Sequence, residues 1–195
     1  MIQYFEKQLK EIDRSIHSLD EKIFGKCLEE VIQTLKHGNK IIASGLGKNV
    51  PICEKFVGTM VSMGFNACFL HTNSAVHGDM GIVKDGDMVI LLTKSGETEE
   101  SVRLARLLKE RDINLWLLTF EKESRLTREI SNAIILKLDH EGDLWNIMPN
   151  NSTTMNLIIL QGLAMIVAER LELNLTQFKR NHPGGMIGEK LRNKE

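Results

Sequence analysis

The stretch Thr93-Lys94-Ser95-Gly96-Glu97-Thr98-Glu99-Glu100 predicts a tight turn between a strand and a helix. The apolar run before it, residues 88–92, is typical of a strand that is buried on both faces. After the turn, residues 101–111 carry leucines at helical spacing. The N–H groups that open such a helix attract anions, and the threonine and serine hydroxyls add donors. The turn is therefore a candidate phosphate site, although an ordinary capped helix start has the same residue types.

Two charged residues near predicted strand ends are candidates for the chemistry. Glu100 lies one helical step before Leu104, so we expect its side chain to continue the buried stripe of the helix and point into a cleft. Lys48 ends the glycine turn Gly45-Leu46-Gly47-Lys48, which follows a strand predicted at 40–44. It is a candidate partner for an anionic substrate, and a solvated surface lysine is the alternative. A third glycine is missing and the next strand ends in His71 rather than an acid, so NAD binding is not expected.

Strand and helix patterns alternate along most of the chain. The strands are predicted at 40–44, 67–70, 88–92, 113–118 and 133–136, with helices at 101–111, 126–130 and 155–171. This order predicts an α/β fold with a parallel sheet covered on both sides. Ligands of open parallel sheets bind at the carboxyl ends of the strands, which is where both candidate turns lie.

The first 38 residues predict helices of a different kind. Apolar residues from Ile2 to Ile23 recur in steps of three and four, as in a seam that packs on another helix of this domain or of another subunit. Residues 18–21 have the pattern of a capping box, so a new helix is expected there that ends at His37 before Gly38. A late helix at 155–171 is apolar nearly all round and must be buried centrally or between subunits. The hydroxyl-rich start of this helix, Ser152 to Thr154, supplies either caps or ligand donors.

Composition limits the class of protein. The chain has 195 residues and a formal net charge of −1, which suits one domain that binds neither nucleic acid nor a membrane surface. There is no signal peptide pattern and no apolar run of spanning length, so a cytoplasmic protein is expected. The odd number of cysteines, without paired spacing, indicates reduced thiols.

Histidines raise two further hypotheses. His182 stands in Asn181-His182-Pro183-Gly184-Gly185, where a proline and glycines fix an unusual backbone path, so we interpret it as functional rather than as part of a closing loop. The alternative is a metal held by His71, His77, Asp79 and His182. Their spacing matches no common zinc signature, so no metal is expected.

Taken together, these elements resemble the sugar isomerase (SIS) domain family, and within it the arabinose-5-phosphate isomerases. The resemblance rests on ordered motifs that cover about the last four-fifths of the chain: Gly45-Leu46-Gly47-Lys48, His77-Gly78-Asp79-Met80-Gly81, Ser95-Gly96-Glu97-Thr98-Glu99-Glu100, Asn151-Ser152-Thr153-Thr154 and His182-Pro183-Gly184-Gly185. It implies a single SIS domain over 1–195, with N-terminal helices at 1–38 and an α/β/α sandwich with a five-stranded parallel sheet at 39–195. It also implies interconversion of D-ribulose 5-phosphate and D-arabinose 5-phosphate without a cofactor, in a homotetramer with sites at subunit interfaces.

The resemblance also assigns site residues. The catalytic residues that it implies are Lys48, Glu100, Glu141 and His182, and the substrate-binding residues are Ser44, Gly45, Gly47, His77, Thr93, Ser95, Thr98, Ser152, Thr153 and Thr154. Glu141 would be the base at C1 or C2, and His77 would reach the site of a neighbouring subunit. Without the resemblance, Glu141 has the pattern of an ordinary exposed loop acid. The roles of Glu100, Glu141 and His182 stay interchangeable at this point.

Some positions depart from the family pattern and keep alternatives open. Lys94 replaces a usual asparagine, and it either strengthens phosphate binding or points to solvent. The C-terminal cystathionine-β-synthase-type modules of many relatives do not follow in this sequence. A sugar-phosphate-sensing module and an isomerase of another phosphosugar remain as rival functions. The sensor is disfavoured because no helix-turn-helix or basic face is evident.

Overall fold

Five apolar stretches form a parallel sheet in the computed structural model of the chain, which describes residues 1–192. The strand order is β2-β1-β3-β4-β5, and each neighbouring pair is parallel, which confirms the predicted five-stranded parallel sheet. The third strand has the predicted bounds, and the other four differ from prediction by one residue at one or both ends. The strands are β1 (Ile41–Gly45), β2 (Ala67–His71), β3 (Met88–Leu92), β4 (Asn114–Thr119) and β5 (Ala133–Ile135).

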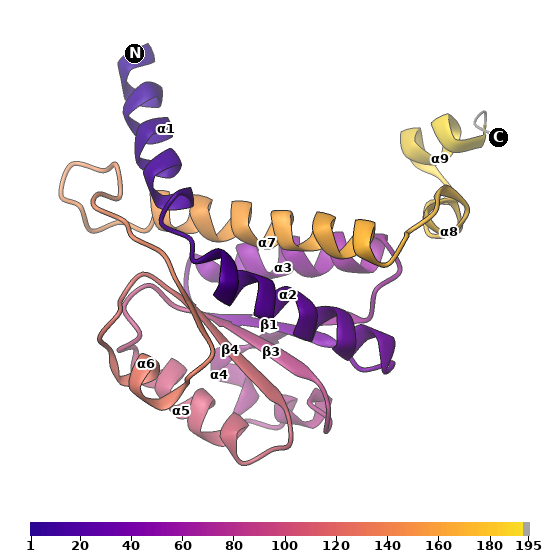
Figure 1. The fold of residues 1–195 in the computed structure, drawn as a ribbon, viewed down its shortest axis with the longest axis horizontal. Coiled ribbons are helices and arrows are strands. Elements are labelled where there is room, and N and C mark those ends of the chain that lie inside the picture. Colours follow the sequence, from indigo (N-terminus) through magenta and orange to yellow (C-terminus); the bar gives the residue numbers. More distant parts are fainter. Residues whose placement is uncertain (193–195) are drawn as a thin grey trace.

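Helices cover both faces of this sheet (Figure 1). One apolar core lies between the sheet and α2 (Glu21–Lys36), α3 (Asn49–Ser62) and α7 (Asn151–Arg170). A second core lies under the opposite face, against α4, α5 and α6. The fold is therefore the predicted α/β/α sandwich. The remaining helical segments are α4 (Thr72–Ala75), η1 (Asp79–Ile82), α5 (Glu99–Lys109), α6 (Arg125–Glu129), α8 (Leu175–Arg180) and α9 (Gly185–Arg192).

A second N-terminal helix begins at Glu21 and ends at its C-cap His37, as predicted, but its N-cap differs from prediction. The apolar seam is interrupted, because α1 (Ile2–Ile16) ends before α2 begins. The predicted capping box is wrong: Asp20 caps α2 by accepting hydrogen bonds from the backbone N–H groups of Lys22 and Ile23. Ser18 instead donates to the carbonyl of Ser15 and accepts from the N–H of Lys137, so it ties the end of α1 to the segment after β5.

Only the second half of α1 packs on the rest of the chain. It buries Glu11, Ile12 and Ser15, whereas the first half projects away from the sandwich (Figure 1). Four apolar side chains on this projecting half are between 63% and 71% exposed: Ile2, Tyr4, Phe5 and Leu9. The helix therefore packs on its own domain at one end and presents an uncovered apolar stripe at the other.

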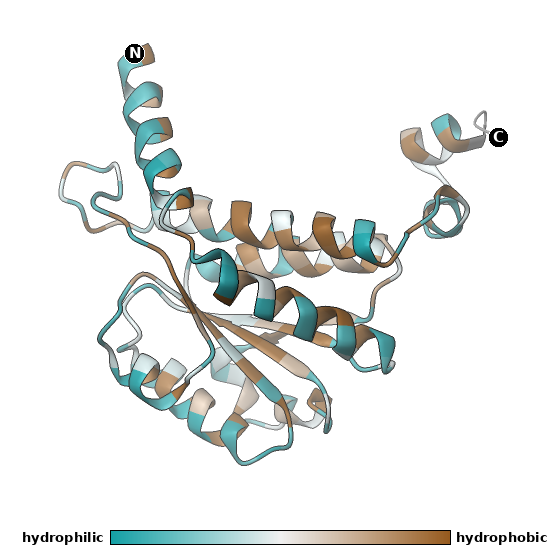
Figure 2. Ribbon diagram, viewed as in Figure 1, coloured by the Kyte–Doolittle hydropathy of each residue, from teal (hydrophilic) through white to brown (hydrophobic). Residues whose placement is uncertain are grey.

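The late apolar helix is a core element of the sandwich. This helix, α7, buries nine residues from Asn151 to Val167 and packs along α3 (Figure 2). By length and composition it is the one helix within residues 1–192 that could cross a membrane, but half of its most apolar window is buried inside this fold. Its hydropathy is therefore explained by packing against the sheet and α3.

The strand order indicates where a ligand-binding crevice should lie. Gly45 at the end of β1 is in register with Leu92 at the end of β3. β1 continues into α3 on one face of the sheet, whereas β3 continues into α5 on the other face. The turns after these neighbouring strands therefore diverge, which is the arrangement at which open α/β sheets bind ligands.

Candidate active site

The turn after β3 is built to leave the start of α5 open to an anion. Thr93 is buried, and its hydroxyl accepts a hydrogen bond from the N–H of Gly96 at 3.2 Å. The hydroxyl of Ser95 accepts from the N–H of Glu97 at 3.2 Å. Thr98 precedes α5 but makes no side-chain cap, so the first-turn N–H groups have no capping hydroxyl.

Glycine is required in this turn for two reasons. Gly96 has a φ of +65°, a conformation that residues with a Cβ rarely adopt. A Cβ at this position would lie 2.1 Å from the hydroxyl oxygen of Ser124, so the turn also packs closely on the start of α6. Gly96 therefore fixes the shape of the turn.

Arg125 neutralises two of the three acids that follow. Its Nε lies 2.9 Å from Glu97 Oε2, and its Nη1 lies 2.8 Å from Glu99 Oε2. The backbone N–H of Arg125 and its guanidinium lower the pKa of Glu97. These contacts offset acidic charge that would otherwise repel a phosphate from the start of α5.

The turn after β1 places Lys48 at the same edge of the sheet. Gly45 is constrained, because a Cβ there would lie 2.8 Å from the Cβ of Asn49 and 3.2 Å from the sulfur of Cys53. Gly47 has a φ of +59°, and Lys48 follows as an exposed residue immediately before α3. Within residues 1–192, Lys48 has no ion-pair partner. Ser44, in contrast, is fully buried and shares a hydrogen bond with the hydroxyl of Thr72.

Glu141 is buried at this edge, although sequence alone suggests an exposed loop acid. Its side chain is 1% exposed, and the Nζ atom of Lys94 lies 2.7 Å from Oε1. Oε2 accepts hydrogen bonds from the backbone N–H groups of Asn150 and Ser152, both at 2.9 Å. The carboxylate thus caps α7 and joins the start of that helix to the turn after β3.

The surroundings of Glu141 favour its ionised form. Burial by itself would raise the pKa of the carboxyl group. The Lys94 ammonium and the N–H groups of Ser152 and Asn150 outweigh that effect and hold the pKa below its ordinary value. The site therefore contains a buried carboxylate that is charged, oriented and balanced by one lysine.

The hydroxyls that begin α7 have local partners. Those of Thr153 and Thr154 both donate to the carbonyl of Asn150, at 2.9 and 3.0 Å. Ser152 is buried, with its N–H bound to Glu141. These hydroxyls donate to a carbonyl within the first turn and do not cap the helix, and the side chain of the N-cap residue Asn150 accepts no hydrogen bond from the first-turn N–H groups. Their role as ligand donors stays a prediction.

Two predicted site residues lie at the same edge but on the surface. Glu100 is exposed on the first turn of α5, so the expectation that it continues the buried stripe is wrong. The stripe of α5 runs instead through Ser101, Leu104, Ala105 and Leu108, with Val102 beside it. His77 is also exposed, in the turn between α4 and η1 that follows β2.

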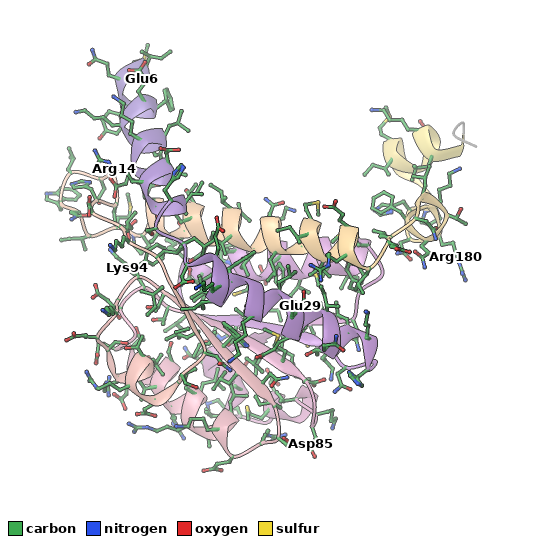
Figure 3. The ribbon with its side chains drawn as sticks, in the orientation of Figure 1. Glu6, Arg14, Glu29, Asp85, Lys94 and Arg180 are labelled. Atoms are coloured by element: carbon green, nitrogen blue, oxygen red, sulfur yellow. The ribbon has the colours of Figure 1, made fainter. Side chains whose placement is uncertain are left out.

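His182 lies at the opposite edge of the sheet. The neighbouring Asn181 donates to the carbonyl of Ser62 at the end of α3, whereas Lys48 stands at the start of that helix. The 14 residues of α3 span about 20 Å. The His182 ring stacks on Phe178 with centroids 4.0 Å apart. In Figure 3 the labelled Lys94 and Arg180 lie on opposite sides of the molecule. Lys94 pairs with Glu141, and Arg180 is two residues before His182, so one chain does not bring His182 to Glu141.

This separation also bears on the metal hypothesis. His71 ends β2 at the carboxyl edge of the sheet, His77 lies in the turn after α4, and Asp79 begins η1. Since His182 lies at the other edge, the four residues do not converge within one chain. Among residues 1–192, no group of three histidine, cysteine or acidic side chains is arranged to hold a metal ion.

A cavity of about 460 Å³ lies between α1 and the loop that precedes α7, which is the loop that contains Glu141. It borders the glutamate's neighbours His140, Gly142, Asn150 and Asn151, but none of the residues of the turns after β1 and β3. Its α1 wall is formed by Tyr4, Lys7, Gln8, Lys10, Glu11 and Arg14. α1 thus lies directly against the loop that carries the buried carboxylate.

Glu11 on α1 fixes that loop. Its Oε1 accepts hydrogen bonds from the backbone N–H groups of Asp139, at 2.6 Å, and His140, at 3.2 Å. Glu11 is 8% exposed, so these groups have little access to water. The glutamate therefore positions the two residues that come immediately before Glu141.

Replacing Glu11 with alanine is expected to lower the free energy of unfolding by about 1–3 kcal/mol, because two backbone donors lose a charged acceptor. Hydrogen exchange at the Asp139 and His140 amides should accelerate in the same variant. Glu6→Ala, at an exposed position of the same helix, is the matched control and should change stability by less than about 0.5 kcal/mol. Equal losses from both variants would contradict this role for Glu11.

Lys94 and Glu11 are contributors to the site that sequence reasoning did not assign. Lys94 departs from the family pattern, but neither of the roles expected for it, a phosphate contact or exposure to solvent, includes its pairing with Glu141. No local pattern identified Glu11, because its partners lie 128 and 129 positions away in the sequence. Its position next to Ile12 of the apolar seam was the available signal.

The chain is similar to known proteins over most of its length. Over 97% of its length the chain is 29% identical to arabinose 5-phosphate isomerase KdsD of Francisella tularensis, of which it covers 58%. An uncharacterized protein of Chlamydia trachomatis is 36% identical over 92% of the chain, which covers 51% of that relative. The chain thus spans about half the length of these curated relatives.

A solved structure also matches most of the chain. The structure of E. coli CFT073 c3406 in complex with arabinose 5-phosphate superimposes with a TM-score of 0.85 and 28% identity, over 92% of this chain and 94% of that one. Residues 34–166 match the profile of the family described as SIS domain. This match runs from the end of α2 through most of α7 and includes every strand and Glu141. The chain belongs to the SIS domain family.

Proposed function

We propose that this chain is an isomerase that interconverts D-ribulose 5-phosphate and D-arabinose 5-phosphate. The observation that carries the proposal is the buried carboxylate of Glu141, which pairs with Lys94 from the candidate phosphate turn at the carboxyl edge of the sheet. Resemblance to the arabinose 5-phosphate isomerases and to the arabinose 5-phosphate complex supports the choice of substrate. The product would supply 3-deoxy-octulosonate for lipopolysaccharide or capsule synthesis, in the cytoplasm and without a cofactor.

The reaction would move a proton between C1 and C2 through a cis-enediol. Glu141 removes the proton from C2 of the open-chain aldose, or from C1 of the ketose, and returns it to the other carbon. The phosphate is held by the turn after β3, where Thr93, Ser95 and Thr98 lie at the start of α5. Lys48 stabilises the negative charge that develops on the substrate oxygens, and Glu100 orients hydroxyl groups.

His182 would come from a second copy of the chain. Within one chain it lies at the far edge of the sheet from Glu141, so its role in ring opening or in proton transfer between O1 and O2 needs another subunit. The exposed apolar half of α1 and the exposed side chains of Leu144, Trp145, Ile147 and Met148 offer surface for such an assembly. We propose a homotetramer with sites at its subunit interfaces, to which His77 also contributes.

Solvent-deuterium exchange tests this function directly. The protein is incubated in D₂O with ribulose 5-phosphate or arabinose 5-phosphate and followed by NMR. Interconversion with deuterium entering at C1 or C2 is the expected result, because the enediol exchanges its proton with solvent. Binding without exchange would contradict the enzyme and favour a sugar-phosphate sensor. Turnover of a hexose or heptose phosphate instead would keep the mechanism and replace the substrate.

A further inference from the structure

Lys94 connects the predicted phosphate turn to the buried carboxylate. Its own backbone is fixed, because its carbonyl accepts hydrogen bonds from the hydroxyl of Thr119 at 3.1 Å and from the N–H of Phe120 at 3.3 Å. The turn after β3 is thereby tied to the end of β4. The lysine side chain starts from a fixed point between Thr93 and Ser95 and reaches across to Glu141.

The two partners differ in their freedom to move. Glu141 is 1% exposed, and its second oxygen is already bound by the backbone N–H groups of Asn150 and Ser152. The Lys94 side chain is 39% exposed, and Glu141 is its ion-pair partner within residues 1–192. The lysine can therefore turn to another anion, whereas the carboxylate stays in place.

We propose that Lys94 is a positioning residue shared by two anions, the Glu141 carboxylate and the phosphate group of the substrate, so that phosphate binding in the turn releases Glu141 to act as a base. The inference rests on the proposed function, since it assumes that the turn after β3 receives a phosphate. It assigns a role to a side chain that otherwise departs from the family pattern without explanation.

Electrostatics explains why phosphate binding would make Glu141 a stronger base. One ammonium cannot pair fully with two anions, and a phosphate monoester carries up to two negative charges against one for the carboxylate. When the ammonium moves toward the phosphate, a buried carboxylate loses its main counter-ion and binds a proton more strongly. A carboxylate that pairs with Lys94 is a weak base, and one that has lost this partner is a stronger base.

Other titratable groups near Glu141 have partners other than its carboxylate, and Arg14 of α1 contacts Glu11 and Asp139. His140 Nδ1 accepts from the N–H of Gly142, and Asp143 accepts from the N–H groups of Trp145 and Ile147. From α1, Glu11 binds the backbone of the loop rather than the carboxylate. Lys94 is thus the charged side chain whose movement would change the charge balance at Glu141.

The first measurement concerns the pair without substrate. Urea unfolding at pH 7 is compared for wild type, Lys94→Met, Glu141→Gln and the double variant, with Lys122→Met as an exposed lysine control from the loop after β4. Lys94→Met should raise the unfolding equilibrium constant about tenfold in wild type, and by less than about threefold in the Glu141→Gln background. Equal effects in both backgrounds would show that the two residues do not interact, which would overturn the proposal.

The second measurement tests whether the Glu141 carboxylate and the substrate phosphate compete for Lys94. Binding of D-arabinose 5-phosphate to Glu141→Gln should be several-fold tighter than to wild type, because Lys94 no longer has a competing anion. The double variant should lose that gain, and Lys94→Arg should bind close to wild type. Unchanged affinity in all of these variants would reduce Lys94 to a structural partner of Glu141 and overturn its role with phosphate.

The third measurement separates this inference from the function. In wild type and Lys94→Arg the acidic limb of kcat/KM should lie at lower pH than in Lys94→Met, since the ammonium stabilises the ionised base. An identical profile in Lys94→Met would overturn the proposal. The binding and unfolding measurements need no turnover, so a protein that shows the shared lysine but no isomerisation would refute the proposed function alone.

Discussion

Replacing Glu141 with glutamine is expected to abolish isomerisation while leaving the fold and phosphosugar binding in place. Glutamine keeps a carbonyl oxygen that can accept the N–H groups of Asn150 and Ser152, so the start of α7 remains capped. It cannot take a proton from carbon. Loss of a general base costs about 10² to 10⁴ in rate, and kcat should fall by that factor while the affinity for arabinose 5-phosphate does not fall.

Asp139→Asn is the matched control for this variant. Asp139 lies two residues before Glu141 in the same loop, but its side chain is 78% exposed, and its ion-pair partner within residues 1–192 is Arg14, at 3.7 Å. Its replacement should leave kcat within about twofold of wild type. Near-normal turnover by Glu141→Gln would remove Glu141 as the base and leave Glu100 or His182 as candidates.

The Glu141→Gln variant should also differ from wild type in how its stability depends on pH. Because the pKa of Glu141 is below its ordinary value of 4.5 in the folded chain, the ionised group stabilises the fold above that pH. This contribution is lost as the pH falls through the lower, folded-state pKa. Unfolding measured between pH 6 and about pH 3 should therefore depend less steeply on pH in Glu141→Gln than in wild type.

The fold could be predicted because its signals are local. A strand that is covered on both faces must be apolar throughout, and β3 shows this pattern without interruption. The alternation with helices then determines a parallel sheet, and the glycine turns mark its carboxyl edge. The start of α2 was predicted, but its cap residue was wrong because Ser18 and Asp20 both have side chains that cap helices, and the hydrogen bonds that Asp20 accepts decide between them.

The site was less predictable because its central residue is defined by distant contacts. Glu141 is buried by α7, paired by Lys94 and positioned through Glu11, and none of these relations has a periodic signature in the sequence. The resemblance selected Glu141 without giving its environment. Glu100 shows the converse error: helical spacing placed it near the buried face, but a residue on the first turn of α5 extends beyond the sheet edge into solvent.

Mixing two inactive variants is expected to restore activity. If His182 acts in the site of another copy, His182→Ala chains still supply an intact Glu141, and Glu141→Gln chains still supply an intact His182. Co-expression with two different tags and tandem purification isolates mixed oligomers. With random exchange of subunits, about a quarter of the sites would contain both intact residues, so activity should rise from near zero to about that fraction of wild type.

The control uses two residues from the same edge of one chain. Lys48 and Glu141 both stand at the carboxyl ends of the strands, so a site that keeps Glu141 in a mixture of Lys48→Ala and Glu141→Gln chains has lost its own Lys48. That mixture should stay inactive. Recovery in both mixtures would place Lys48 in a different subunit from Glu141. If neither mixture recovers activity and the His182→Ala chains are still folded, His182 does not reach the site of another copy. The ring stack on Phe178 would then make its role structural, at the far edge of the sheet.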